Sequence, residues 1–137
     1  MKRFGYVSVI AKNLKLAWSV SIVEISNEFN LSTEVAEWLG TITERIVEHF
    51  QPLQLVLFGS QARGDAHANS DIDLLVVLAQ VEDQRKTAIA IRRVLADLPI
   101  AKDIIVTTPD EISRRGFLIG TVLRQALQEG KVVYERG

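Results

Sequence analysis

The stretch FGSQARGDAHANSDIDLLVV, residues 58–77, joins the end of one apolar run to the start of another. It places Gly59 and Ser60 before the joining segment and two aspartates, Asp71 and Asp73, after it. Successive side chains of a strand point to opposite faces, so two acids one residue apart point the same way and repel each other. The alternative is that the aspartates merely brace a turn at the strand entrance. The glycine–serine pair at the other side of the turn favours a functional site.

Apolar periodicity divides the rest of the chain into helices and strands. Continuous apolar runs of strand length flank the turn, and helical spacing begins after Ser32 and stops at Pro52. Thr108, Pro109 and Glu111 combine a capping box with proline at the first helical position. We expect helices at about 33–50, 82–98 and 109–130, the last interrupted at Gly116 and capped at Gly130, and strands at 53–58, 70–78, 103–108 and 131–135.

The order of these elements predicts where the acids lie. Gly59 ends the first strand and Asp71 opens the second, so the two can share a site only if these strands are antiparallel neighbours. Asp103 opens the third strand, after a crossover helix that makes it parallel to the second. We therefore predict an α/β (α+β) fold with a mixed β-sheet flanked by helices. In this fold Asp71, Asp73 and Asp103 converge on one edge of the sheet.

Composition limits the class of protein. The chain has 137 residues, of which 47% are hydrophobic and 24% charged, as expected of one globular domain. Its net charge of −1 gives no sign of a broad surface for nucleic acid or membrane, and no apolar stretch is long enough to span a bilayer. The absence of cysteine excludes disulfides and thiolate chemistry. We expect a soluble, cytoplasmic protein.

Residues 1–30 form an N-terminal extension to a domain at 31–137. Apolar residues occupy every second position from Leu14 to Ile22, which is a strand pattern. An added strand or hairpin, an oligomer contact and a poorly ordered extension all stay open, and so does a homo-oligomer.

Clustered carboxylates beside a glycine–serine turn indicate phosphate chemistry. Like charges within a few ångströms raise one another's pKa, and a divalent cation removes the conflict. Oxygen ligands with open positions suit magnesium, which shares its coordination with waters and substrate phosphates. Gly59 lets the backbone approach a ligand, and Ser60 adds a hydroxyl and an amide that favour phosphate. The arrangement describes phosphoryl or nucleotidyl transfer.

These residues resemble a known signature. Gly59 and Ser60, ten further residues, and then Asp71 and Asp73 around Ile72 are similar to the motif of the DNA polymerase beta-like nucleotidyltransferases. The segments GSQARG, SDIDLLV, KDIIVTTPDEI and ALQEGKVVYER resemble its minimal, MNT-type members, over about residues 33–136.

The resemblance implies a nucleoside triphosphate donor, ATP, bound with two Mg²⁺ ions, and transfer of its nucleoside monophosphate to a hydroxyl acceptor. It assigns Gly59 and Ser60 to the triphosphate, Asp71 and Asp73 to both metals, and Asp103 to the metal that activates the acceptor. Minimal members pair with a HEPN protein as a toxin–antitoxin couple in which the nucleotidyltransferase is the antitoxin and can adenylylate its partner. The resemblance therefore also implies a HEPN-type partner.

Several alternatives stay open. Arg63 is placed either to contact phosphate or to form a salt bridge with Asp65, Asp71 or Asp73. Elsewhere, Lys102 is expected to point away from the acids, and Arg92 and Arg93 to form a solvated helix face. The protein can also be a binding module that neutralises its partner by contact, or a nucleotidyltransferase acting on a small molecule.

Overall fold

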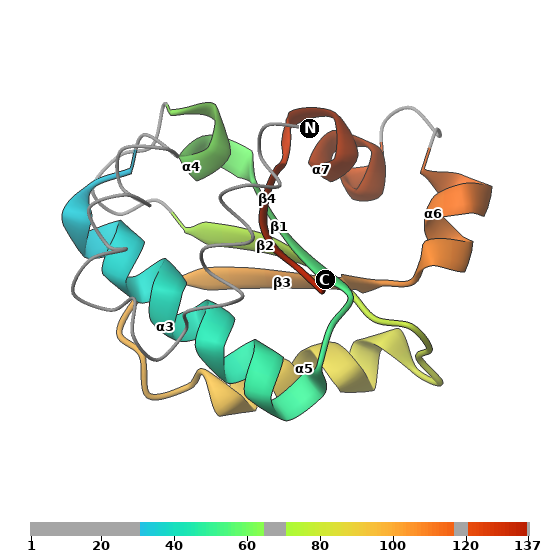
Figure 1. Ribbon diagram of the computed structural model, residues 1–137, viewed down its shortest axis with the longest axis horizontal. Coiled ribbons are helices and arrows are strands. Elements are labelled where there is room, and N and C mark those ends of the chain that lie inside the picture. The colour runs from blue at the N-terminus through green and yellow to red at the C-terminus, as the bar shows by residue number, and fades with distance from the viewer. Residues whose placement is uncertain (1–30, 65–70, 117–120, 137) are drawn as a thin grey trace.

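Four strands form one mixed sheet with helices on both faces (Figure 1). The computed structural model describes residues 31–64, 71–116 and 121–136. The extension at 1–30, with its expected strand pattern, lies outside the described residues, so its division from the domain stays a prediction. The elements are α3 (Thr33–Phe50), β1 (Gln54–Phe58), α4 (Gly59–Arg63), β2 (Ile72–Val77), α5 (Gln84–Val94), β3 (Lys102–Thr107), α6 (Pro109–Arg115), α7 (Val122–Glu129) and β4 (Lys131–Glu135).

The strand order is β3-β2-β1-β4. Strand β1 is antiparallel to both β2 and β4, and its last residue, Phe58, lies opposite Asp73. Strand β3 is parallel to β2 and sets Asp103 beside Asp73. The predicted topology is confirmed, because the end of the first strand meets the starts of the second and third.

The two faces of the sheet carry separate cores. Helices α3 and α5 cover one face, below the sheet in Figure 1, whereas α4, α6 and α7 lie above it. The smaller core, on the α7 face, contains Leu75 and Val77 of β2 and Ala126 of α7. Because side chains alternate along β2, Asp73 continues this row and faces the same side as α4 and α7. No helix in the described ranges is both long and apolar enough to cross a membrane.

Two helices differ from their predicted lengths. Helix α5 ends at Val94 rather than near residue 98, because the chain turns at Leu95, whose carbonyl accepts from the amide of Leu98 at 3.1 Å. The predicted helix at 109–130 is divided into α6 and α7, which confirms the interruption predicted at Gly116, because α6 ends at Arg115 and Gly116 is its C-cap. Thr121 caps the second through a 3.1 Å bond from the amide of Arg124 to its hydroxyl, which marks a new start.

Only one of the two hydrogen bonds of the predicted capping box forms at the start of α6. The Thr108 hydroxyl accepts from the amide of Glu111 at 3.1 Å, as predicted. The Glu111 carboxylate does not return to the cap and instead accepts from the hydroxyl of Thr107 and, at 2.8 Å, from Nε2 of Gln84. Thr107 is fully buried, so its hydroxyl needs a partner inside the protein, and this need diverts Glu111.

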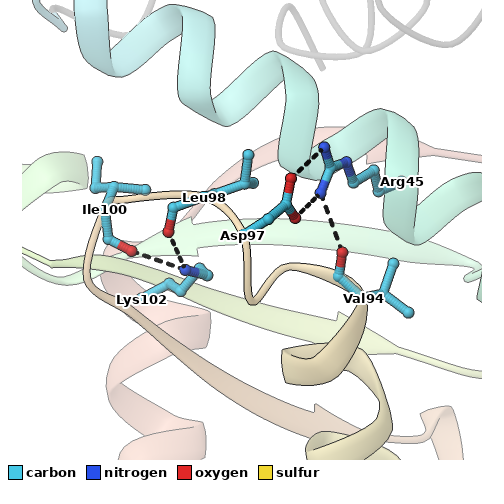
Figure 2. A network of polar contacts seen from close by, with 6 residues as sticks. All are labelled: Arg45, Val94, Asp97, Leu98, Ile100 and Lys102. Carbon is cyan, nitrogen blue, oxygen red and sulfur yellow. Dashed lines mark hydrogen bonds and ion pairs between the residues drawn. The ribbon is translucent and has the colours of Figure 1, made fainter.

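An arginine on α3 holds the connection between α5 and β3 (Figure 2). Both terminal nitrogens of Arg45 bind the Asp97 carboxylate, and Nη1 also donates to the carbonyl of Val94 at 3.1 Å. The hydrogen bond from Arg45 lowers the pKa of Asp97. The contact fixes the chain just before β3, where Asp103 stands.

Lys102 strengthens the same connection. Its Nζ donates to the carbonyls of Leu98 at 3.0 Å and of Ile100 at 2.8 Å (Figure 2). The ammonium therefore binds the preceding turn instead of the neighbouring acid, as the alternation of side chains on a strand predicted.

Candidate active site

The corner between β1 and α4 brings Gly59 against Asp73. Helix α4 begins at Gly59, directly after the strand, with φ +74°, a conformation that favours glycine. A Cβ at this position would lie 3.0 Å from Asp73 Cγ and would overlap Asp73 Oδ2. Both the backbone conformation and the neighbouring carboxylate therefore require glycine here.

Three aspartates gather at this edge of the sheet. Asp73 is half-buried, Asp103 lies beside it in the strand register, and Asp71 is exposed immediately before β2. Burial, and then the negative charges of Asp103 and Asp71, raise the pKa of Asp73 to about 6, while the positive charge of Arg63 opposes the rise. The structure thus brings together the three acids that the sequence singled out, with Asp73 at the centre.

Asp103 has a cationic neighbour that the sequence did not predict. Nη2 of Arg92 lies 3.3 Å from Asp103 Oδ1 and 3.3 Å from the carbonyl oxygen of Ile104. Arg92 and Arg93 are both exposed, as expected of a solvated helix face, but the ion pair between Arg92 and Asp103 was not predicted. Both side chains stay about half exposed, at 46% and 51%, so solvent screens the pair.

Glu129, the last residue of α7, is the functional candidate that sequence reasoning missed. Its Oε1 accepts from the amide of Gly59 at 3.1 Å, from Arg63 Nη1 at 3.0 Å and from Gln125 Nε2 at 3.1 Å. Its charge also contributes to the raised pKa of Asp73. Two signals were available in the sequence: its spacing of four from Gln125 on a helix, and its place in the segment ALQEGKVVYER, to which no site residue was assigned.

The two phosphate candidates of α4 have different surroundings. Among the described residues Arg63 forms an ion pair with Glu129 of α7, which was not predicted. The predicted pair with Asp65 stays a prediction, because Asp65 lies outside the described residues. Ser60, partly exposed in the first turn of α4, has no side-chain hydrogen bond to any residue in the described ranges. Its hydroxyl is therefore available to a ligand.

The acids form an open set rather than a closed cage. Within the described ranges, no three or more His, Cys, Asp or Glu residues are grouped so that they could hold a metal ion by themselves. A carboxylate row that leaves most positions to other ligands fits magnesium, which keeps waters and is held through one or two carboxylates and the phosphates of a substrate. Burial, and then the charges of Asp103 and Asp71, raise the pKa of Asp73, so a cation bound here would favour its ionised form.

Comparisons with known proteins agree with this geometry. The family model of the nucleotidyltransferase domain matches residues 39–133, which include all the candidate site residues. A solved Sulfolobus solfataricus protein to which nucleotidyltransferase activity has been ascribed shares the fold, with a TM-score of 0.55 and 22% identity over 85% of this chain and 88% of that chain.

A mutant form of the toxin-antitoxin pair MntA-HpeT matches with a TM-score of 0.44 and 24% identity, over 70% of this chain and 72% of that chain. This similarity is too weak to support a conclusion about the present chain. Comparison with curated proteins found no match.

Proposed function

Because the chain belongs to the nucleotidyltransferase domain family, we propose that it transfers a nucleoside monophosphate from a nucleoside triphosphate, AMP from ATP, to a hydroxyl acceptor. The acceptor oxygen bonds to the α-phosphorus and its proton passes to solvent. The bond from the α-phosphorus to the oxygen that bridges to the β-phosphate breaks, and pyrophosphate leaves. The observation that carries this proposal is the position of Asp73, which has Gly59 against its carboxylate and Asp103 beside it on the next strand. Groups suited to phosphate and groups suited to a cation meet at this point.

The chain's own groups divide the work. The Ser60 hydroxyl binds the triphosphate, Gly59 lets the triphosphate come close to the backbone at this corner, and Arg63 adds positive charge one turn further along α4. Asp71 and Asp73 would hold two Mg²⁺ ions. Asp103 would complete the coordination of the ion that activates the acceptor. Magnesium, when bound, supplies charge that stabilises the reacting phosphate and lowers the pKa of the attacking hydroxyl. The protein contributes chiefly position and charge.

The acceptor that we favour is a hydroxyl on a HEPN-type partner, with this chain as the antitoxin of the couple. Support comes from the motif segments GSQARG and ALQEGKVVYER, which resemble the minimal nucleotidyltransferases. A small-molecule acceptor is the other form of the same activity.

One observation favours a second function. The ion pair between Arg92 and Asp103 partly neutralises the third carboxylate, as expected if the site no longer bound its metals. In that case the chain would neutralise its partner by contact alone.

Transfer of labelled ATP separates these functions. The protein is incubated with Mg²⁺, the product of the adjacent reading frame, and ATP labelled at either the α- or the γ-phosphate. Nucleotidyl transfer predicts label on the acceptor from α-labelled ATP only. Label from γ-labelled ATP would identify phosphoryl transfer instead, and inhibition of the partner without any label would favour neutralisation by contact.

A further inference from the structure

Helix α4 lacks a cap of its own, and Glu129 supplies one from a distant part of the chain. The N-cap residue, Phe58, has no side chain able to accept a hydrogen bond. The amide of Gly59 instead donates to Glu129 Oε1 at 3.1 Å, across 70 residues of sequence. The orientation of the Gly59 peptide therefore depends on α7.

The same oxygen also holds the other end of α4. Arg63, the last residue of α4, donates to Glu129 Oε1 at 3.0 Å. A single carboxylate oxygen thus fixes both the glycine of the proposed triphosphate site and its arginine. A hydrogen bond to a charged group is stronger than a neutral one, so this oxygen is a firm attachment point.

Glu129 is itself held in place by tight packing. A Cβ on the next residue, Gly130, would overlap both the carbonyl oxygen of Ala126 and the Val56 side chain of β1. Ala126 is fully buried in the core between α7 and the sheet. The end of α7 is therefore packed closely against β1, which fixes the backbone from which the Glu129 side chain extends.

The two polar groups at the corner between β1 and α4 differ in whether they already have a hydrogen-bond partner. Glu129 occupies the amide of Gly59, whereas the hydroxyl of Ser60 has no side-chain hydrogen bond within the described ranges. Glu129 is also an anion, beside Asp73, in a place that must accept a polyphosphate. The negative charge of Glu129 repels the triphosphate. Glu129 therefore favours substrate binding only if its positioning of Gly59 and Arg63 gains more binding free energy than this repulsion costs.

We propose that Glu129 is a positioning residue of the nucleotidyl-transfer site, which holds the Gly59 peptide and the Arg63 guanidinium so that Ser60 and Arg63 face the triphosphate. This inference rests on the proposed function. It assigns a role in binding nucleotide to the end of α7, a part of the segment ALQEGKVVYER to which the resemblance gave no site residue.

Binding of ATP in the presence of Mg²⁺, measured by calorimetry, tests the proposal without reference to turnover. Glu129→Ala removes the acceptor and is expected to weaken binding about tenfold, as loss of a charge-assisted hydrogen bond predicts. Glu129→Gln keeps an oxygen at the same place and is expected to recover most of the affinity. Glu37→Ala, an exposed glutamate on the opposite face, is the matched control and should bind as the wild type does.

The outcomes are distinct. Tighter binding by both Glu129 variants would overturn the proposal, since it would show that the carboxylate competes with the phosphates. Unchanged ATP affinity in Glu129→Ala, with only a lower melting temperature, would overturn it in favour of a purely structural contact. Failure of the wild type to bind ATP with Mg²⁺ would instead contradict the proposed function.

Discussion

The carboxylate of Asp73 lies against the backbone of Gly59, so closely that the glycine has no room for a Cβ. The antiparallel pairing of β1 with β2, with Phe58 opposite Asp73, creates this contact. It places the glycine of the proposed triphosphate site and a carboxylate suited to a cation at one point of the sheet edge.

Gly59→Ala is expected to abolish binding of ATP with Mg²⁺ and to lower the stability by about 1–3 kcal/mol, because the methyl group would displace Asp73 and strain a positive φ. Calorimetry measures the first effect and denaturant unfolding the second. Gly64→Ala, at φ +79° beyond the other end of α4, controls for the strain alone. If both variants bound ATP equally well, the contact with Asp73 would not matter for the site.

Asp73→Asn is expected to stabilise the metal-free protein at pH 7.5. The pKa of Asp73 rises from an ordinary value of 3.8 to about 6 on folding, chiefly through burial and the charge of Asp103. The folded state then binds more protons than the unfolded state between these values, so stability falls as the pH rises from about 4 to 6. Above that window the ionised carboxylate destabilises the fold by roughly 1 kcal/mol, after allowance for solvent screening.

Thermal unfolding with EDTA measures this effect. The variant should melt about 2–5 °C above the wild type at pH 7.5, and the difference should vanish near pH 4. Added MgCl₂ should raise the melting temperature of the wild type and leave that of Asp73→Asn nearly unchanged. A variant less stable than the wild type at pH 7.5 without metal would contradict the like-charge description of the site.

Arg92→Gln is expected to increase the stabilisation that Mg²⁺ gives. The arginine pairs with Asp103 and so competes with a cation for that carboxylate. Without metal the variant should be slightly less stable, by less than about 1 kcal/mol, because the pair is exposed. Arg93→Gln, the exposed neighbour on the same helix, is the control in the same Mg²⁺ titration. A weaker Mg²⁺ response in Arg92→Gln would mean that Arg92 positions Asp103 instead of competing for it.

The sequence was enough to predict the sheet and the convergence of the acids. Apolar runs located β1 and β2, and the handedness of the crossover placed Asp103 beside Asp73, because both rules depend on local pattern and backbone geometry. The position of Lys102 followed from strand alternation in the same way.

Contacts that depend on tertiary packing could not be predicted. Glu129 reaches Gly59 only because α7 packs on β1, and Arg92 reaches Asp103 only because α5 lies beside an edge strand. The Glu111 carboxylate does not make the predicted capping contact, because the buried hydroxyl of Thr107 requires a partner and donates to it. In each case the partner of a long polar side chain is fixed by how the elements pack or by which neighbouring groups are buried, and neither is visible in the local sequence pattern.

The assignment of the sheet edge at Asp73 as the active site is tested most directly by the transfer of label from α-labelled ATP to the partner protein. The wild type is compared with Asp73→Asn and Asp110→Asn. Asp110 is an exposed aspartate on α6, paired with Arg114, and serves as the matched control. We expect the wild type and Asp110→Asn to transfer label at similar rates and Asp73→Asn to lose at least about 99% of the rate, as removal of a group that stabilises the transition state does. Equal transfer by Asp73→Asn would contradict the assignment of this edge of the sheet as the active site.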